Sequence, residues 1–170
     1  MKRLKDVGES IALIFKRMAP LGDKMGPTLF QLPPNLEFNQ DTRERLARCL
    51  TQIPKGKRCA FEFRHSSWYA DPVFDLLRDH DAALCISDHA AAPAPWVATA
   101  QFAYIRAHGT SGRYEGSYGR GVLRRWVADL ETWRKEKRDL FVYFDNDLKS
   151  AAPADAGELL GLLKKPGSAT

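Results

Sequence analysis

Five short apolar segments alternate with segments of helical periodicity along the chain, and this order constrains the fold more than any other feature. The apolar segments are Thr28–Leu32, the start of Cys59–Tyr69, Ala82–Ser87, Phe102–Ala107 and Leu140–Phe144. Strands that alternate with helices pair in parallel, and they are apolar because both faces of their sheet are covered. The sequence therefore predicts an α/β fold with a parallel sheet and right-handed crossovers.

Helical periodicity marks most of the segments around the predicted strands. Apolar side chains recur at helical spacing in Ile11–Met18, Leu46–Ile53, Val73–Leu77, Val122–Trp133 and Leu159–Leu163. Between the third and fourth strands, a loop rich in alanine and proline, His89–Trp96, takes the place of a helix. A glycine-rich loop, Thr110–Gly121, follows the fourth strand.

Two architectures fit this order: an open doubly wound sheet, or part of a (β/α) barrel. The chain has neither a G-x-G-x-x-G motif nor a P-loop, which weakens the case for a nucleotide-binding open sheet. All the predicted strands end in polar or turn residues, and in both architectures the ligand site lies at that edge. Polar residues gathered from several strand ends favour the barrel.

Composition narrows the class of protein without identifying a function. The 170 residues indicate one domain, which we assign to residues 1–164, with 165–170 as a flexible tail. The net charge of +5 comes from scattered residues, which indicates a solvated surface more than a nucleic-acid groove. The three cysteines form no C-x-x-C pair, which indicates reduced thiols. The apolar run Ile11–Phe15 is too short for a signal peptide or a membrane span, so we expect a cytoplasmic protein with no membrane partner.

Five motifs in the chain resemble those of a known family and occur in the same order. They are LGDKMGPTLFQLPP, FEFRHSSWY, LCISD, FAYIRAHG followed by Tyr114 and Tyr118, and FVYFDND. The chain is thereby identified as a member of the YecE-like family of domains of unknown function (DUF seventy-two), with a resemblance that extends from Leu21 to Leu163. It implies a TIM-type (β/α) barrel in which these strands are the fourth to eighth, so we expect an incomplete barrel and a truncated chain. The resemblance implies a fold and a site but no reaction.

The chain departs from the family pattern at several positions. The family usually has asparagine where Asp145 stands, so this chain adds a negative charge at the edge of the expected pocket. Proline and leucine are usual where Ser66 and Ala107 stand, and asparagine is usual where Asp155 stands. The charge of Asp145 bears most directly on any function carried over from the family.

The stretch Cys59–Tyr69 contains the most informative candidate residues. Period-two alternation places Glu62 and Arg64 on one face of their strand and two phenylalanines on the other. Charged side chains on a buried face are costly unless they pair with each other, a ligand or an ion. The candidate catalytic residues are Glu62, His65 and His108, and the candidate substrate-binding residues are Gln31, Arg64, Trp68, Asp88, Arg106, Tyr114, Tyr118, Tyr143 and Asn146.

Each assignment has a structural alternative. Glu62 and Arg64 could act as a base or metal ligand beside an anion clamp, or form an ion pair inside the barrel mouth. His65 could transfer protons or cap the strand end, and Asp88 could bind a ligand or cap a loop. Tyr114 could belong to a mobile wall over a pocket or pack in an ordinary loop.

The sequence does not identify a cofactor, and a divalent metal ion is one candidate. Histidine, aspartate and glutamate at the strand ends are ligands that divalent ions accept, but none has a diagnostic spacing, so we assign no metal ligand. Ser66 and Ser67 lie near His65 but lack the G-x-S-x-G elbow of a serine nucleophile.

The sequence supports three hypotheses about function, and whether the protein is an enzyme stays open. In the first, Arg64 and Arg106 bind a small anionic substrate, such as a phosphorylated sugar or nucleotide, which nearby carboxylate or imidazole groups hydrolyse or isomerise. In the second, the chain binds nucleic acid or cleaves phosphodiesters with a metal, and aromatic side chains such as Trp68 and Trp96 stack on bases. In the third, the chain is inactive, because five strands cannot close an eight-stranded barrel and open strand edges favour self-association.

Overall fold

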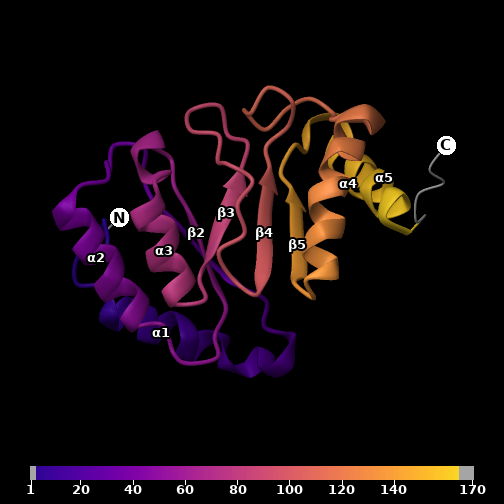
Figure 1. The fold of residues 1–170 in the computed structure, drawn as a ribbon. Coiled ribbons are helices and arrows are strands. Elements are labelled where there is room, and N and C mark those ends of the chain that lie inside the picture. Colours follow the sequence, from indigo (N-terminus) through magenta and orange to yellow (C-terminus); the bar gives the residue numbers. More distant parts are fainter. Residues whose placement is uncertain (1–2, 165–170) are drawn as a thin grey trace.

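The computed structural model of the chain describes residues 3–164. Its elements are α1 (Gly8–Met18), β1 (Thr28–Gln31), α2 (Gln40–Thr51), β2 (Cys59–Glu62), α3 (Asp71–Asp79), β3 (Ala83–Ser87), β4 (Phe102–Ala107), α4 (Gly119–Lys135), β5 (Asp139–Phe144) and α5 (Ala151–Lys164), with 3-10 helices at Ala19–Lys24, Ser66–Trp68 and Leu148–Ser150. In the view of Figure 1, α1, α2 and α3 lie to the left of the sheet, and α4 and α5 lie to its right. The predicted tail, 165–170, lies outside the described residues.

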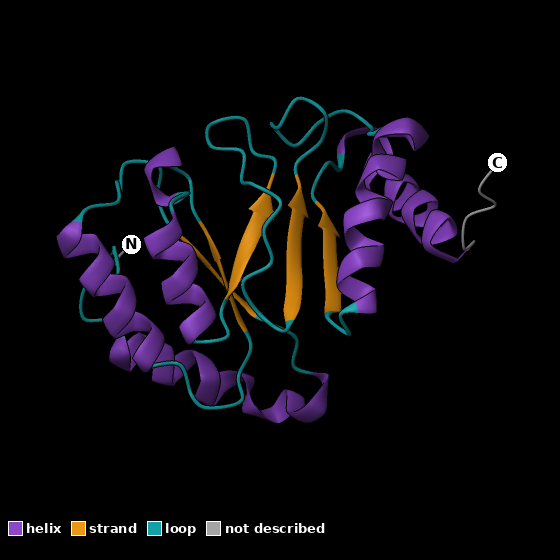
Figure 2. Cartoon of the chain, viewed as in Figure 1, coloured by secondary structure: helices purple, strands orange, loops and turns teal. Residues whose placement is uncertain are grey.

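The strands form one sheet in the order β1-β2-β3-β4-β5, and every neighbouring pair is parallel. Each connection therefore advances the sheet by one strand in the same direction, and right-handed crossovers then all pass over the same face. Figure 2 shows a helix in each connection except that between β3 and β4, which is a loop. The prediction of an α/β fold with parallel strands and interleaved helices is confirmed.

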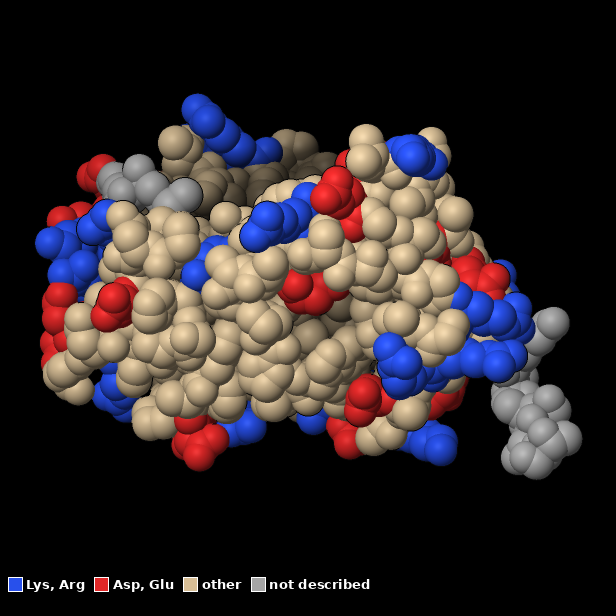
Figure 3. Space-filling view, turned by 90° about the horizontal axis from the view of Figure 1, so that it is seen from above, with Lys and Arg blue, Asp and Glu red and all other residues tan. Residues whose placement is uncertain are grey.

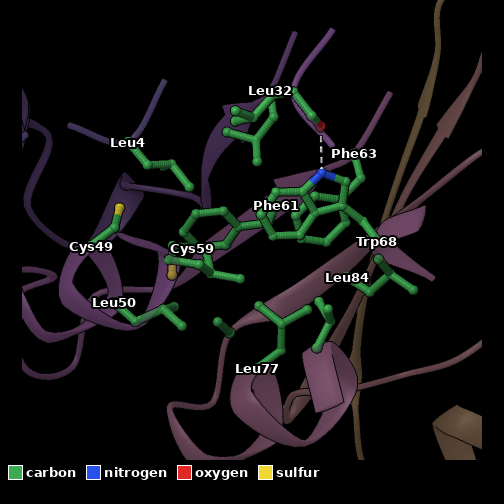
Figure 4. Close-up of a cluster of buried hydrophobic side chains, with 14 of the residues drawn as sticks. Leu4, Leu32, Cys49, Leu50, Cys59, Phe61, Phe63, Trp68, Leu77 and Leu84 are labelled. Carbon is green, nitrogen blue, oxygen red and sulfur yellow. Dashed lines mark hydrogen bonds between the residues drawn. The ribbon is translucent and has the colours of Figure 1, made fainter. Parts of the chain in front are cut away.

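The face of the sheet that the helices cover, here called the outer face, is apolar. Phe61 and Phe63 are completely buried there, together with Trp68 and Leu77 (Figure 4). The indole of Trp68 stacks on Phe63 with 4.7 Å between ring centroids, and its N–H donates to the carbonyl oxygen of Leu36 at 2.7 Å. Burial of such large apolar side chains is the main favourable contribution to folding.

A second apolar cluster joins α4 and α5 to the outer face of β4 and β5. It includes Ile105 from β4, Leu123 and Leu130 from α4, and Leu159 from α5. The two α4 leucines are seven residues apart, so they lie on one side of the helix. This cluster fixes α4, and with it the end of the glycine-rich loop, against the sheet.

Alternate strand residues point to the opposite, inner face of the sheet, and their character changes along the strands. One buried cluster on this face contains Ala60, Ala83, Cys85, Phe102 and Tyr104. Toward the C-terminal ends the inner-face side chains become polar or charged. That edge is where parallel sheets bind their ligands, so the inner face positions the candidate site.

Two further features bear on the sequence predictions. None of the helices within residues 3–164 is long and apolar enough to cross a bilayer. The three cysteines are free and buried, as is usual for cysteine in an apolar strand or helix. The cytoplasmic location stays a prediction.

Candidate functional site

Glu62, the last residue of β2, is completely buried at the centre of a charged cluster on the inner face. Its Oε1 lies 2.6 Å from Arg64 Nη2, and its Oε2 lies 2.6 Å from Arg106 Nη1. Arg64 occupies the next inner-face position after Glu62, whereas Arg106 comes from β4, two strands away. An unpaired buried carboxylate costs several kcal/mol, so the two guanidinium groups are what allow Glu62 to be buried.

Gln31 and Asp145 complete the surroundings of the arginines. Gln31 Oε1, at the end of β1, accepts hydrogen bonds from Arg64 at 3.2 Å and from Arg106 at 3.3 Å. Asp145, directly after β5, accepts a hydrogen bond from Arg106 Nη2 at 2.5 Å. Burial alone would lower the pKa of Arg106, but the contacts with Glu62 and Asp145 raise that pKa above its ordinary value. The guanidinium groups are thus held next to each other by carboxylates on both sides.

His108 directly follows β4 and is completely buried beside the arginines. Its Nδ1 lies 3.3 Å from Asp88 Oδ1, and its Nε2 lies 3.3 Å from Arg64 Nη2. Because a guanidinium can only donate, the contact with Arg64 favours the tautomer that carries its proton on Nδ1 and a lone pair on Nε2. That proton is donated to Asp88. A carboxylate that orients a histidine in this way is the arrangement used for proton transfer.

Asp88 links the strand ends to the glycine-rich loop. Its Oδ1 accepts the backbone N–H of His108 at 2.6 Å, and its Oδ2 accepts the hydroxyl proton of Tyr118. The Tyr118 oxygen in turn accepts the backbone N–H of Gly109 at 2.6 Å. Burial alone would raise the pKa of Asp88, but the hydrogen bonds from His108 and Tyr118 outweigh it and lower that pKa. Asp88 is therefore ionised at neutral pH.

Tyr114 covers the cluster from the glycine-rich loop. Its hydroxyl lies 3.3 Å from Arg64 Nη2, and its ring meets the ring of His108 edge-on with 4.9 Å between centroids. Tyr114 is 44% exposed, and its backbone has a φ of +69°, which is unfavourable for a residue with a side chain. An exposed side chain on a strained backbone, placed over a buried cluster, is consistent with a loop that opens. The role of Tyr114 in a mobile wall stays a prediction.

The structure brings most of the predicted site residues to this one place. They are Gln31, Glu62, Arg64, Asp88, Arg106, His108, Tyr114 and Tyr118. Their roles toward a substrate stay predictions. The four other candidates, His65, Trp68, Tyr143 and Asn146, lie in different surroundings.

His65 and Trp68 point away from the cluster because the chain turns into a 3-10 helix at Ser66–Trp68. His65 Nδ1 lies 2.8 Å from the Ser67 hydroxyl and accepts the Ser67 N–H at 3.3 Å, while Nε2 lies 3.7 Å from Glu37. His65 thus caps the short helix that follows the strand, and its role in proton transfer stays a prediction. Trp68 is completely buried in the core and offers no surface to a ligand, so we reassign it from substrate binding to packing.

Tyr143 and Asn146 lie at the end of β5 without contacting the arginines through any hydrogen bond in the described chain. Tyr143 is 43% exposed, and its ring packs beside Tyr104 on the inner face with 5.1 Å between centroids. Asn146 is buried and donates to the carbonyl oxygen of Gly116 and to Asp155, both at 2.8 Å. Asn146 therefore holds the glycine-rich loop in position.

Ser87 and His89 also contact the cluster, although they were not predicted as site residues. Ser87 Oγ donates to Glu62 Oε1 at 3.3 Å and lies 3.4 Å from His108 Nδ1. The ring of His89 lies 5.4 Å from that of His108, and burial, followed by the nearby cationic groups, lowers the pKa of His89. The strand period places Ser87 on the same face as Cys85, so register could have identified it. His89 lies in a loop, where no comparable signal exists.

The donor set of the cluster favours anions over metal ions. Within residues 3–164, no group of three or more His, Cys, Asp and Glu side chains is placed to hold a metal ion. The carboxylates of Glu62 and Asp145 instead contact arginines. Guanidinium groups bind phosphates and carboxylates through pairs of parallel hydrogen bonds. The arginines are therefore the groups most suited to hold a ligand.

Fold and site together define an α/β protein with a charged cluster at the carboxyl ends of a parallel sheet. The chain belongs to the family described as "Protein of unknown function DUF72", whose profile matches residues 1–170. The YecE-like assignment made from the motifs is thereby confirmed.

Solved structures of DUF72 family proteins are similar to the chain in fold. A crystal structure from Thermotoga maritima has a TM-score of 0.85 and 24% identity, and the match covers 95% of this chain and 67% of that one. Two crystal structures of a protein from Enterococcus faecalis have TM-scores of 0.80 and 0.77, with 18% and 19% identity, and the matches cover 96% and 91% of this chain and 68% of the other. The chain thus spans about two thirds of their length. No curated protein is significantly similar to it.

Proposed function

We propose that the charged cluster binds a small anionic molecule, such as a phosphorylated sugar or a nucleotide, through Arg64 and Arg106. The observation that carries the proposal is the contact of both guanidinium groups with Glu62, at 2.6 Å each, which fixes them next to each other. A pair of prepositioned guanidinium groups binds an anion without the entropy cost of ordering two long side chains. Arg106 is the more accessible of the two, since its side chain is 19% exposed.

Asp145 sets the affinity in this proposal. It contacts Arg106 Nη2 at 2.5 Å, so an incoming anion competes with a carboxylate for the same guanidinium group. The side chain of Asp145 is 31% exposed, which leaves it room to turn toward solvent when a ligand enters. Removal of its charge should therefore strengthen anion binding.

A ligand reaches Arg64 only if the loop that carries Tyr114 moves, because this side chain covers Arg64 and His108. In the closed arrangement Arg64 Nε is buried without a hydrogen-bond partner among the described residues. Such an unsatisfied group costs about 1–3 kcal/mol. Most buried polar groups in native proteins are paired, and a ligand that bonds to Arg64 Nε would supply the missing partner here.

His108 is the group best placed to move a proton, as a hydrolase or an isomerase requires. Asp88 holds its Nδ1 proton, so Nε2 faces the cluster. A ligand that draws Arg64 away frees the Nε2 lone pair to act as a base. Glu62 has both oxygens bound to arginines, so it acts as a positioning residue for them.

We also infer that the sheet is an arc of a TIM-type (β/α) barrel. The inference is supported by the sequential order of its parallel strands and by the charged cluster at the C-terminal ends of their inner face. Among the described residues, β1 and β5 are the edge strands of the sheet. Open edges favour self-association, which light scattering at increasing protein concentration would detect.

Nucleic acid is the less supported ligand. Trp68 is buried in the core, and Trp96 packs against Trp126 and Trp133 of α4 on the outer face, away from Arg64 and Glu62. Figure 3 shows Lys and Arg side chains interspersed with Asp and Glu over the face viewed, with no field of one sign. Single-stranded oligonucleotide therefore serves as a comparison ligand, and its binding should show the salt dependence of phosphate contacts if it occurs.

Calorimetric titration of the full chain with ribose 5-phosphate, inorganic phosphate and unphosphorylated ribose tests the proposal. We expect the two phosphates to bind and ribose not to bind. Arg106→Gln should weaken binding by about tenfold or more, since charge-assisted hydrogen bonds contribute about 1.5–3 kcal/mol. Asp145→Asn should strengthen it severalfold.

Arg78→Gln is the matched control, because Arg78 forms an exposed pair with Asp75 on α3 at 2.7 Å. It removes the same charge far from the cluster and should leave affinity unchanged. The proposal is wrong if neither the natural chain nor the Asp145→Asn variant binds phosphate, or if Arg106→Gln binds as the natural chain does.

A further inference from the structure

A cavity of about 350 Å³ lies on the outer face of the sheet, between β3, β4, α4 and the β3–β4 connection. Its walls are mostly apolar and include Ile86, Ile105, Trp96 and Trp126. Asp88 lines it where the strands end. Small-molecule sites typically enclose about 300–1,000 Å³, so the cavity is large enough for a molecule of one or two rings.

The cavity exists because the β3–β4 connection contains no helix to fill the outer face at this point. The connection is nevertheless fixed at both ends. The Ala94 N–H donates to the Ser87 carbonyl oxygen at 2.7 Å, and the Thr99 hydroxyl accepts the Leu84 N–H at 2.7 Å. The hollow is therefore a built feature of the fold and not the space beneath an untethered loop.

Aromatic rings form one wall of the cavity, where Trp96 and Trp126 contact each other with 5.5 Å between ring centroids, and both are supported from behind. Trp96 stacks on Trp133 with 5.9 Å between ring centroids and 14° between planes. Trp126 packs against Tyr118 at 4.8 Å and against Phe144 at 6.0 Å. These contacts fix both tryptophans, which are only half-buried, at the edge of the cavity. Such rings bind planar aromatic molecules by offset stacking or edge-to-face contact.

Asp88 adds one charged acceptor to these apolar walls. It already accepts from the backbone N–H of His108, from His108 Nδ1 and from the Tyr118 hydroxyl. A carboxylate offers about four acceptor positions, so one remains for a ligand. The side chain of Asp88 is 35% exposed, and it lines the cavity. One carboxylate beside aromatic rings suits a planar molecule that carries an N–H donor.

We propose that this cavity is a binding site for a planar aromatic molecule whose ring N–H donates to Asp88. The cavity opens on the outer face, whereas Arg64 and Glu62 lie on the inner face. Ser87 and Arg106, which belong to the charged cluster, also line it where the strands end. It does not depend on anion binding. Asp88 borders both places, since it contacts His108 on one side and the cavity on the other.

Titration of the full chain with indole and with benzofuran tests the proposal. The two molecules have the same bicyclic shape, but benzofuran has an oxygen in place of the ring N–H. We expect saturable binding of indole to one site, about tenfold or more tighter than benzofuran, because a hydrogen bond to a carboxylate contributes about 1.5–3 kcal/mol. Equal affinities, or no saturable binding of indole, would overturn it.

Cavity-filling variants locate the binding. Ala107→Leu from β4 and Val122→Phe from α4 both add side-chain volume at lining positions and should abolish indole binding. Ala128→Leu on the exposed side of α4 is the control and should bind indole as the natural chain does. Retained binding in both filled variants would place indole elsewhere and refute the site. The indole and benzofuran comparison uses the natural chain, so it decides the matter even where a filled variant does not fold.

Discussion

Glu62 Oε2 and Arg106 Nη1 meet at 2.6 Å across the intervening strand β3, although the two residues are 44 positions apart in the chain. The pair is possible because both residues occupy inner-face positions at the C-terminal ends of parallel strands. Arg64 binds the other oxygen of the same carboxylate at 2.6 Å. A single buried glutamate thus sets the relative position of two guanidinium groups, which makes it the residue on which the proposed site depends.

Replacement of Glu62 by glutamine should destabilise the fold strongly. The variant keeps the shape of the side chain but leaves two arginines, one of them buried, without their shared counter-charge. Loss of one partner in a buried ion pair costs about 3–5 kcal/mol. Urea denaturation followed by circular dichroism measures this loss.

Asp75→Asn is the control for the Glu62 variant. Asp75 pairs with Arg78 at 2.7 Å, but its side chain is 67% exposed. Exposed pairs contribute at most about 1 kcal/mol, so this variant should unfold close to the natural midpoint. If both variants lose the same stability, the shared ion pair does not hold the cluster together.

Asp88 should make the stability of the protein depend on pH in the acid range. Hydrogen bonds from His108 and Tyr118 outweigh burial and lower the pKa of Asp88 below its ordinary value of 3.8. A lowered carboxyl pKa stabilises the fold above pH 3.8, and this contribution disappears as the pH falls through the folded-state pKa.

Asp88→Asn should therefore lower the free energy of unfolding at neutral pH and match the natural chain in strong acid. The expected loss at neutral pH is about 1 kcal/mol, because solvent screens a side chain that is 35% exposed. Urea denaturation at a series of pH values measures the difference. A difference that is constant with pH would show that ionisation of Asp88 contributes nothing to stability.

Gly109 should tolerate no side chain. Its φ is +87°, and a Cβ atom there would clash with the backbone carbonyl group of Glu115. We expect Gly109→Ala to cost more than about 2 kcal/mol, from the strained backbone and the clash together. Gly121 lies inside α4, where an added Cβ atom would meet open space, so Gly121→Ala should stabilise by about 0.5–1 kcal/mol. Thermal melts of both variants should shift in opposite directions.

The strands and helices could be predicted because apolar periodicity determines them directly. In the stretch that contains β2, Phe61 and Phe63 lie on the outer face, and Glu62 and Arg64 lie on the inner face. This division could also be predicted, because side chains alternate along a strand. The meeting of Glu62 with Arg106 could be expected only in outline. The C-terminal ends of parallel strands share one edge, but the sequence does not state which charges touch.

The positions of side chains outside the strands could not be predicted, because the strand period ends after Arg64. His65 and Trp68 belong to the same motif in the sequence, yet the 3-10 helix at Ser66–Trp68 turns them away from the cluster. Short turns of this kind have no periodic signal. His89 was missed for the same reason, because its position beside His108 depends on how a loop folds back.

The cysteine thiols should be unreactive in the folded protein. Burial raises the pKa of Cys49 to about 11. For Cys59, burial and then nearby charges raise the pKa to about 12. Burial also raises the pKa of Cys85 well above its ordinary value. Only the thiolate attacks a disulfide reagent, so native protein should react no faster than it unfolds, and all three thiols should react at once in denaturant. Ala128→Cys places a thiol on an exposed helix surface and should react immediately. Fast reaction of the natural chain would contradict the burial of its cysteines.

Trp68→Phe should reduce stability while leaving anion binding intact. The change removes the hydrogen bond to the Leu36 carbonyl oxygen, 2.7 Å long, and leaves that buried acceptor unsatisfied. The cost should be about 1–3 kcal/mol, with a further loss from the smaller ring beside Phe63. Calorimetric titration with phosphate at a temperature where the variant is fully folded should give the affinity of the natural chain. A phosphate affinity that falls tenfold in this folded variant would contradict the prediction. It would show that the core and the cluster are coupled, because the Trp68 side chain has no exposed surface through which to touch a ligand.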